Sequence, residues 1–100
     1  MSFAQLVNED MRLKVLQALE EDPDYSHNEA VIQSVLAAVG HNVSHDRLRT
    51  ELHWLAEQGL ISIDGIAGVL VVKLTTRGED VALGRARVPG VKRPGPGDRP

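Results

Sequence analysis

Two amphipathic helical segments joined by only four residues constrain this chain more than any other feature. The first segment has an apolar stripe formed by Val31, Ile32, Val35, Leu36 and Val39. It ends at Gly40, where a left-handed helix cap favours glycine. The second segment begins at Ser44, a good N-cap, places Leu48, Leu52 and Leu55 on one face, and ends before Gly59. The short connection, residues 40–43, predicts a helix–turn–helix.

A further amphipathic stretch, residues 2–21, precedes this pair and predicts a helix that ends before Pro23. Phe3, Leu6 and Leu13 lie nearly opposite its main apolar stripe. Two interpretations follow. Either Asn8 starts the helix and residues 2–7 form a loose arm, or one continuous helix packs both on its own core and on a second copy. The second interpretation predicts a homodimer interface at these three apolar residues.

Capping boxes at Ser26–Glu29 and Thr76–Glu79 predict the starts of the second helix and of a short closing helix. Between them, residues 60–63 and 69–74 are β-rich runs, and residues 64–68 supply turn residues for a hairpin. The order of elements predicts a mainly α fold with a small β-hairpin, a winged helix–turn–helix. It comprises a three-helix bundle, a two-stranded wing and a short C-terminal helix within residues 1–85. Residues 86–100 are rich in Pro and Gly, which predicts a flexible, disordered basic tail.

The composition excludes several classes of function. The 100 residues contain no Cys, which removes disulfides, thiolate nucleophiles and cysteine-ligated metals. No apolar run is long enough to cross a membrane, and no secretory signal is visible, so we expect a cytoplasmic protein. His41 and His45 lack the further ligands of a metal site, so neither a metal nor a cofactor is expected. No phosphate loop or acid–base pair is visible, and we expect no enzymatic activity.

The stretch from Val43 to Leu55, then Gly59-Leu60-Ile61, a strand pair and Leu74-Thr75-Thr76-Arg77-Gly78, resembles the winged-helix repressors of the arsenic-type and MarR-like superfamily. The chain is more similar to small winged-helix proteins of Mu-like phages and prophages. That closer resemblance lies in Thr50-Glu51-Leu52-His53-Trp54-Leu55, Gly59-Leu60-Ile61, and the tail from Gly84 to Pro94. The resemblance implies a transcriptional regulator of a phage or prophage. The metal-sensing cysteines of the arsenic-type repressors have no counterpart here, so it does not imply metal-responsive regulation.

Duplex DNA is the first expected partner, read by the third helix in the major groove. The candidate DNA-binding residues are Ser44, His45, Arg47, Arg49, Thr50 and His53 on that helix, Lys73 and Arg77 beside the hairpin, and Arg85, Arg87, Lys92 and Arg93 in the tail. A solvated surface helix explains the same helix residues equally well, and a solubilising terminus explains the tail equally well. The hairpin tip, residues 64–68, carries no cation, unlike the usual DNA-binding wing.

The alternative is an interaction module that docks on a phage or host protein without binding DNA itself. Residues 1–84 hold six Lys or Arg against thirteen Asp or Glu, a formal charge of −7, which is not the footprint of a strong DNA binder. Trp54 is then an exposed anchor for the partner, because Trp is enriched at interface hot spots. The competing interpretation places Trp54 half-buried against the hairpin or the first helix.

Overall fold

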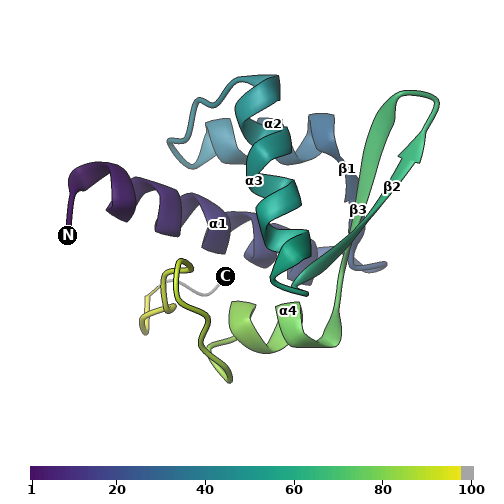
Figure 1. Ribbon diagram of the computed structural model, residues 1–100. Coiled ribbons are helices and arrows are strands. Elements are labelled where there is room, and N and C mark those ends of the chain that lie inside the picture. The colour runs from purple at the N-terminus through teal and green to yellow at the C-terminus, as the bar shows by residue number, and fades with distance from the viewer. Residues whose placement is uncertain (98–100) are drawn as a thin grey trace.

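The computed structural model describes residues 1–97, which form four helices and one three-stranded antiparallel sheet (Figure 1). In chain order the elements are α1 (Phe3–Glu21), β1 (Ser26–Asn28), α2 (Glu29–Ala38), α3 (His45–Glu57), β2 (Ile61–Ile66), β3 (Val69–Leu74) and α4 (Thr76–Ala82). The strand order is β1-β3-β2, so β3 pairs with its hairpin partner and with a strand from much earlier in the chain. The chain is a small α+β domain, with one strand more than the mainly α fold expected from the sequence.

The pair of helices α2 and α3 is confirmed, but α2 begins later than expected. Ser44 caps α3 by accepting a hydrogen bond from the N–H of Arg47 at 3.0 Å, and the inward leucines of α3 are fully buried. Asn28, not Ser26, caps α2, because its side chain accepts the N–H of Val31 at 3.0 Å. Ser26 instead belongs to β1, whose backbone groups pair with β3. Sheet pairing satisfies those groups and leaves the adjacent Asn28 as an equally good cap.

Helix α1 is continuous from Phe3, so residues 2–7 do not form a loose arm. Ser2 and Gln5 form a reciprocal capping box, with distances of 2.8 and 3.1 Å, and this holds the first turn in helical form. Leu13 is fully buried in the core of its own chain, so it is not available to a dimer interface. The exposed apolar residues near this end of α1 are Met1, Phe3 and Leu6.

The hairpin is confirmed, with a tighter turn than expected. Residues 64–66 continue β2, and the turn is only Ala67-Gly68, both with positive φ, +52° and +79°. These angles match the two-residue turns that suit the twist of antiparallel strands. Helix α4 is capped by Thr75, one residue earlier than expected, through the N–H of Gly78 at 3.0 Å. A Cβ at residue 78 would lie 2.0 Å from the carbonyl oxygen of Leu60, so only glycine fits there.

The C-terminal segment packs onto the body, contrary to the expected flexible tail. Val88 and Val91 are buried and belong to the same core as the helices and the sheet. The N–H of Lys92 donates to the carbonyl oxygen of Glu9 at 3.1 Å. Proline restricts the backbone of this segment, and its two valines are buried in the core, so the segment is held without a helix or strand. The last part of the expected tail, residues 98–100, lies outside the described residues.

Candidate functional site

The outward side of α3 carries an exposed stripe, which we call the outer stripe: Asp46, Thr50, His53 and Glu57. Their spacing of four, three and four residues places them one above another on the helix. His45 and Arg47 beside the outer stripe are exposed as well. The leucines of α3 point the opposite way into the core. The outer stripe therefore offers two carboxylates, one at each end, with a hydroxyl and an imidazole between them.

Arg49 is held by a buried carboxylate at the side of this stripe. Its Nε and one terminal nitrogen donate to the two carboxylate oxygens of Glu29 at 2.8 and 2.7 Å, and that same terminal nitrogen donates to the carbonyl oxygen of Gly68 at 2.9 Å. Glu29 also accepts the N–H of Leu70 at 2.6 Å, and His45 Nε2 lies 2.6 Å from it. We call this cluster the Glu29 node. It ties the start of α2, the side of α3 and the hairpin together.

The electrostatics of the Glu29 node follow from its burial. Glu29 is only 3% exposed, and burial alone disfavours its charged form. The hydrogen bonds from Arg49 outweigh that penalty, and the N–H of Leu70 and the contact with His45 add to them. Together they lower the pKa of Glu29 to about 2. The same ion pair raises the pKa of Arg49. Arg49 and His45 are therefore both engaged by Glu29, and the side chain of His45 remains 54% exposed.

Arg47, on the other side of the outer stripe, is held less tightly. Its Nε lies 3.1 Å from Glu51, and its terminal nitrogen donates to the side-chain oxygen of Asn8. Glu51 is also paired with Arg12 at 2.6 Å. The side chain of Arg47 is 44% exposed, compared with 34% for Arg49. Glu51 keeps a cationic partner if Arg47 turns away, so Arg47 is the more available of the two.

Trp54 is covered by the chain itself. The guanidinium of Arg12 lies 4.0 Å from the centre of its ring, and the same Arg12 donates to the carbonyl oxygen of Gly90 at 3.0 Å. A Cβ at Gly90 would come within 2.8 Å of the indole ring. This placement favours the half-buried interpretation, with Trp54 against α1 and the C-terminal segment.

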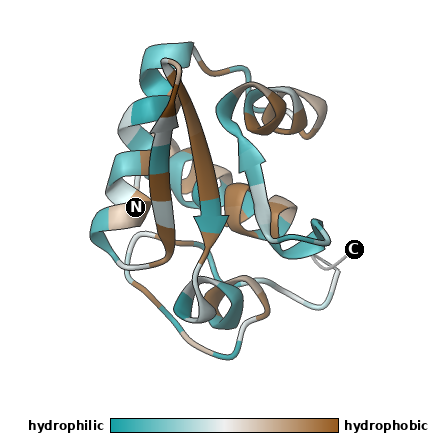
Figure 2. Ribbon diagram, turned by 90° about the vertical axis from the view of Figure 1, so that its right-hand side faces the viewer, coloured by the Kyte–Doolittle hydropathy of each residue, from teal (hydrophilic) through white to brown (hydrophobic). Residues whose placement is uncertain are grey.

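The hairpin tip presents apolar side chains. Ile66 and Val69 face each other across the strands on the same side of the sheet, and both are exposed. Figure 2 shows the apolar colouring that runs along this hairpin. Lys73 pairs with Ser62 toward the base of the hairpin, and Arg77 follows in the first turn of α4. These two cations therefore do not supply positive charge at the tip.

The basic residues of the C-terminal segment form a separate group. This segment lies at the opposite end of the molecule from the hairpin tip (Figure 1). Arg85 is 3.7 Å from Asp80, and Lys92 is 3.3 Å from Asp10. Burial raises the pKa of Asp10, but the hydrogen bond with His41 and the charges of Lys14 and Lys92 hold it below its usual range. Arg87 and Arg93 are exposed and form no ion pair within residues 1–97. The twelve candidate DNA-binding residues are thus not brought onto one surface.

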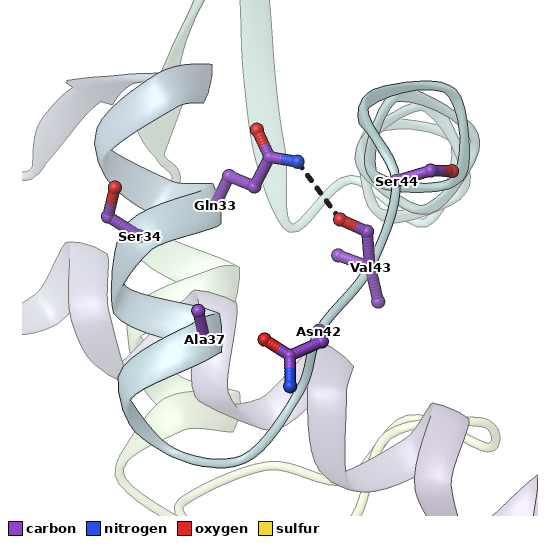
Figure 3. A pocket seen from close by; sticks show the side chains of 6 residues that line it. All are labelled: Gln33, Ser34, Ala37, Asn42, Val43 and Ser44. Atoms are coloured by element: carbon purple, nitrogen blue, oxygen red, sulfur yellow. Dashed lines mark hydrogen bonds between the residues drawn. The ribbon is translucent and has the colours of Figure 1, made fainter.

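A shallow hollow of about 510 Å³ lies beside the turn between α2 and α3 (Figure 3). It is lined by Gln33, Ser34, Ala37, Asn42, Val43 and Ser44. The amide of Gln33 donates to the carbonyl oxygen of Val43 at 2.9 Å and fixes the turn (Figure 3). No ionisable side chain lines this hollow. Among the described residues, no group of three His, Asp or Glu side chains is placed to hold a metal ion.

Sequence reasoning missed the Glu29 node because Glu29 was assigned to a capping box with Ser26. The spacing of Arg47 and Glu51, four residues apart on one helix, was the visible signal of a local ion pair.

No helix within residues 1–97 is long and apolar enough to span a bilayer.

Comparison with known proteins shows a relation to phages. No protein-family model and no solved structure matches this chain. It is 50% identical over 91 residues to the uncharacterized protein gp26 of Escherichia phage Mu, which covers 91% of this chain and 94% of that protein. It is also 44% identical over 78 residues to an uncharacterized protein of Haemophilus influenzae, covering 77% of this chain and 76% of the relative. The chain therefore belongs to the family of the phage Mu protein gp26.

Proposed function

We propose that this protein is a winged-helix interaction module of Mu-like phages that binds another protein through the outer stripe of α3 and the hairpin tip. The order of elements, α1-β1-α2-α3-β2-β3-α4, and the sheet order β1-β3-β2 support the winged-helix assignment. In a winged helix–turn–helix, the third helix and the hairpin form the surface offered to a ligand.

The observation that carries this proposal is the chemistry of that surface. The outer stripe ends in two carboxylates, Asp46 and Glu57, and the adjoining hairpin tip exposes Ile66 and Val69. Double-stranded DNA carries one negative charge about every 1.7 Å of its axis and repels such a stripe. A protein partner with basic groups would complement the carboxylates of the outer stripe, and apolar groups on the same partner would complement Ile66 and Val69 of the hairpin tip.

Besides the charge of the outer stripe, the Glu29 node also weighs against recognition of DNA bases by α3 in the major groove. For Arg49 to reach a base, it would have to leave Glu29 buried without its main partner. Breaking this pair removes the partner that does most to lower the pKa of Glu29, and that cost works against the roughly 1–3 kcal/mol of discrimination from one bidentate base contact.

A transcriptional regulator that binds duplex DNA is the second candidate. The availability of Arg47 favours it, since Glu51 retains Arg12 when Arg47 moves. Arg87 and Arg93 could add contacts to phosphates from the C-terminal segment.

One pair of measurements separates the two candidates. In phage-producing cells, a photo-crosslinking amino acid at position 50 should capture one defined phage or host protein. The Glu57→Lys variant should reduce that capture at least tenfold, because it reverses the charge of the outer stripe. Asp24→Lys is the matched control, an equal charge reversal at an exposed residue after α1, and should leave capture unchanged.

The second measurement is fluorescence anisotropy with a random duplex at ~50 mM salt, where the proposal expects no binding. Binding with a log–log salt slope near −4 to −5 would identify a DNA-binding protein that uses four to six cations, and would refute the proposal. Failure of position 50 to capture any defined protein would also refute it.

A further inference from the structure

The first turns of α1 form a rigid apolar projection. Phe3 is 83% exposed and Leu6 is 51% exposed, although both lie in a helix that is capped by Ser2 and Gln5. Figure 1 shows this end of α1 extending beyond the rest of the molecule. Residues 1–8 contain no charged side chain. We call Phe3 and Leu6, with the exposed Met1 beside them, the N-terminal projection.

A groove with apolar side chains, which could receive the N-terminal projection, runs between the C-terminal half of α1 and α2. Val31, Val35 and Val39 follow one another at intervals of four residues along α2, opposite Ala18 of α1. We call these four residues the valine groove. Two adjoining hollows of about 220 and 110 Å³ lie along it and share Ala18, Glu21 and Val35. Lys14, Gln17 and His27 line them as well. Val31 is 37% and Val39 is 47% exposed, and Figure 2 shows the apolar colouring of α2.

The projection cannot fill the groove of its own chain. Both belong to α1, and twelve residues separate Leu6 from Ala18 along that helix. At about 1.5 Å per residue, they are held roughly 18 Å apart. Any contact between the two surfaces must therefore join different molecules.

Charge gives this contact a direction. The first turn of α1 has no acidic residue and its last turn has no basic one. Instead Glu20, Glu21 and Asp22 gather at the C-terminal end, and the last two line the valine groove. The helix dipole leaves the N-terminal end of α1 positive and makes this acidic end more negative. The positive end of one α1 thus complements the negative end of another.

We propose that the protein self-associates head to tail, with the N-terminal projection of one copy seated in the valine groove of the next. This arrangement differs from the homodimer interface at Phe3, Leu6 and Leu13 that the sequence predicts, because Leu13 is buried. A head-to-tail contact closes into a ring or continues as a filament. The contact is small, so we expect it to form at about 100 μM and not at nanomolar concentrations.

Sedimentation equilibrium between about 10 and 500 μM tests the proposal with complementary variants. Phe3→Asp removes the projection, and Val31→Glu removes one wall of the groove. Both substitutions place an acid in the first turn of a helix, where it favours folding. Each variant alone should stay monomeric, whereas wild type should gain mass beyond a dimer as the concentration rises. An equimolar mixture of the two variants should form a dimer and nothing larger, because just one intact projection and one intact groove remain to meet.

Thr76→Glu is the control, since it likewise places an acid in the first turn of a helix, at an exposed residue of α4 that lines neither surface. It should associate as wild type does. Circular dichroism spectra and melting curves confirm that each variant is folded, and Val39→Asp repeats the groove test at a second position. A wild-type monomer at 500 μM would overturn the proposal. So would a Val31→Glu variant that still dimerises, since that result indicates two-fold pairing.

Discussion

Replacing Glu29 by glutamine should remove the pH dependence of stability that the Glu29 node creates. Glutamine keeps the shape of the side chain but cannot carry the charge that Arg49 requires. The pKa of Glu29 falls from 4.5 to about 2 on folding. At about 1.36 kcal/mol for each unit of pKa, the node contributes at most about 3 kcal/mol. Water reaches Arg49, whose side chain is 34% exposed, so we expect a loss of about 2 kcal/mol at pH 7.

The sign of the pH dependence follows from the lowered pKa. The contribution of Glu29 is complete above pH 4.5 and is lost as the pH falls from there toward 2. Urea unfolding at a series of pH values from 7 to 2 measures this directly. The stabilities of wild type and Glu29→Gln should differ most at pH 7 and converge near pH 2. Glu57→Gln, an exposed glutamate on α3, is the control and should change stability by less than about 0.5 kcal/mol. A constant difference across the pH range would refute the reasoning.

Three further predictions concern the contacts around the core. Gly90→Ala should destabilise the protein by about 1–3 kcal/mol, because the added Cβ would meet the indole ring of Trp54 at 2.8 Å and the φ of +97° disfavours alanine. The fluorescence of Trp54 should shift to the red as its ring is displaced. Unchanged emission would show that the two residues do not touch. Val91→Ala should cost about 1.5 kcal/mol in urea unfolding for the loss of two buried carbons, whereas a detached tail would show no loss. Arg49→Ala should destabilise the protein more than Arg47→Ala does, because Glu29 loses its main partner whereas Glu51 keeps Arg12, and Arg47→Ala should cost less than about 1 kcal/mol. Equal losses in the same assay would contradict the distinction between them.

Local patterns predicted much of the fold. The cap at Ser44 and the leucine stripe of α3 lie within one helix, so the sequence alone contains their signal. The hairpin was predictable for the same reason, since its turn joins neighbouring strands. Strand β1 was not predictable, because Ser26–Asn28 is too short to show alternation and pairs with a strand far along the chain. Its serine then gave a false capping signal three residues before Glu29.

The candidate site was less predictable than the fold. Helical periodicity predicts that Arg47 and Arg49 lie on the solvent side of α3. It does not predict which carboxylates pair with them. Glu29 reaches Arg49 only after α2 and α3 have packed together, and the N–H of Leu70 joins the same carboxylate from the hairpin. Composition likewise concealed the burial of Val88 and Val91, because the surrounding prolines and glycines are typical of flexible segments. In both cases the deciding interaction joins residues distant in sequence.

The packing of the C-terminal segment on α1 has a consequence for biosynthesis. Arg12 and Glu9 leave the ribosome well before their partners Gly90 and Lys92, which come about eighty positions later. Part of the surface of α1 therefore stays uncovered until those partners have been synthesised. This domain can finish folding only after the segment that holds Val88 and Lys92 has emerged, so a nascent chain stalled before Val88 should be sensitive to proteases that the finished protein resists.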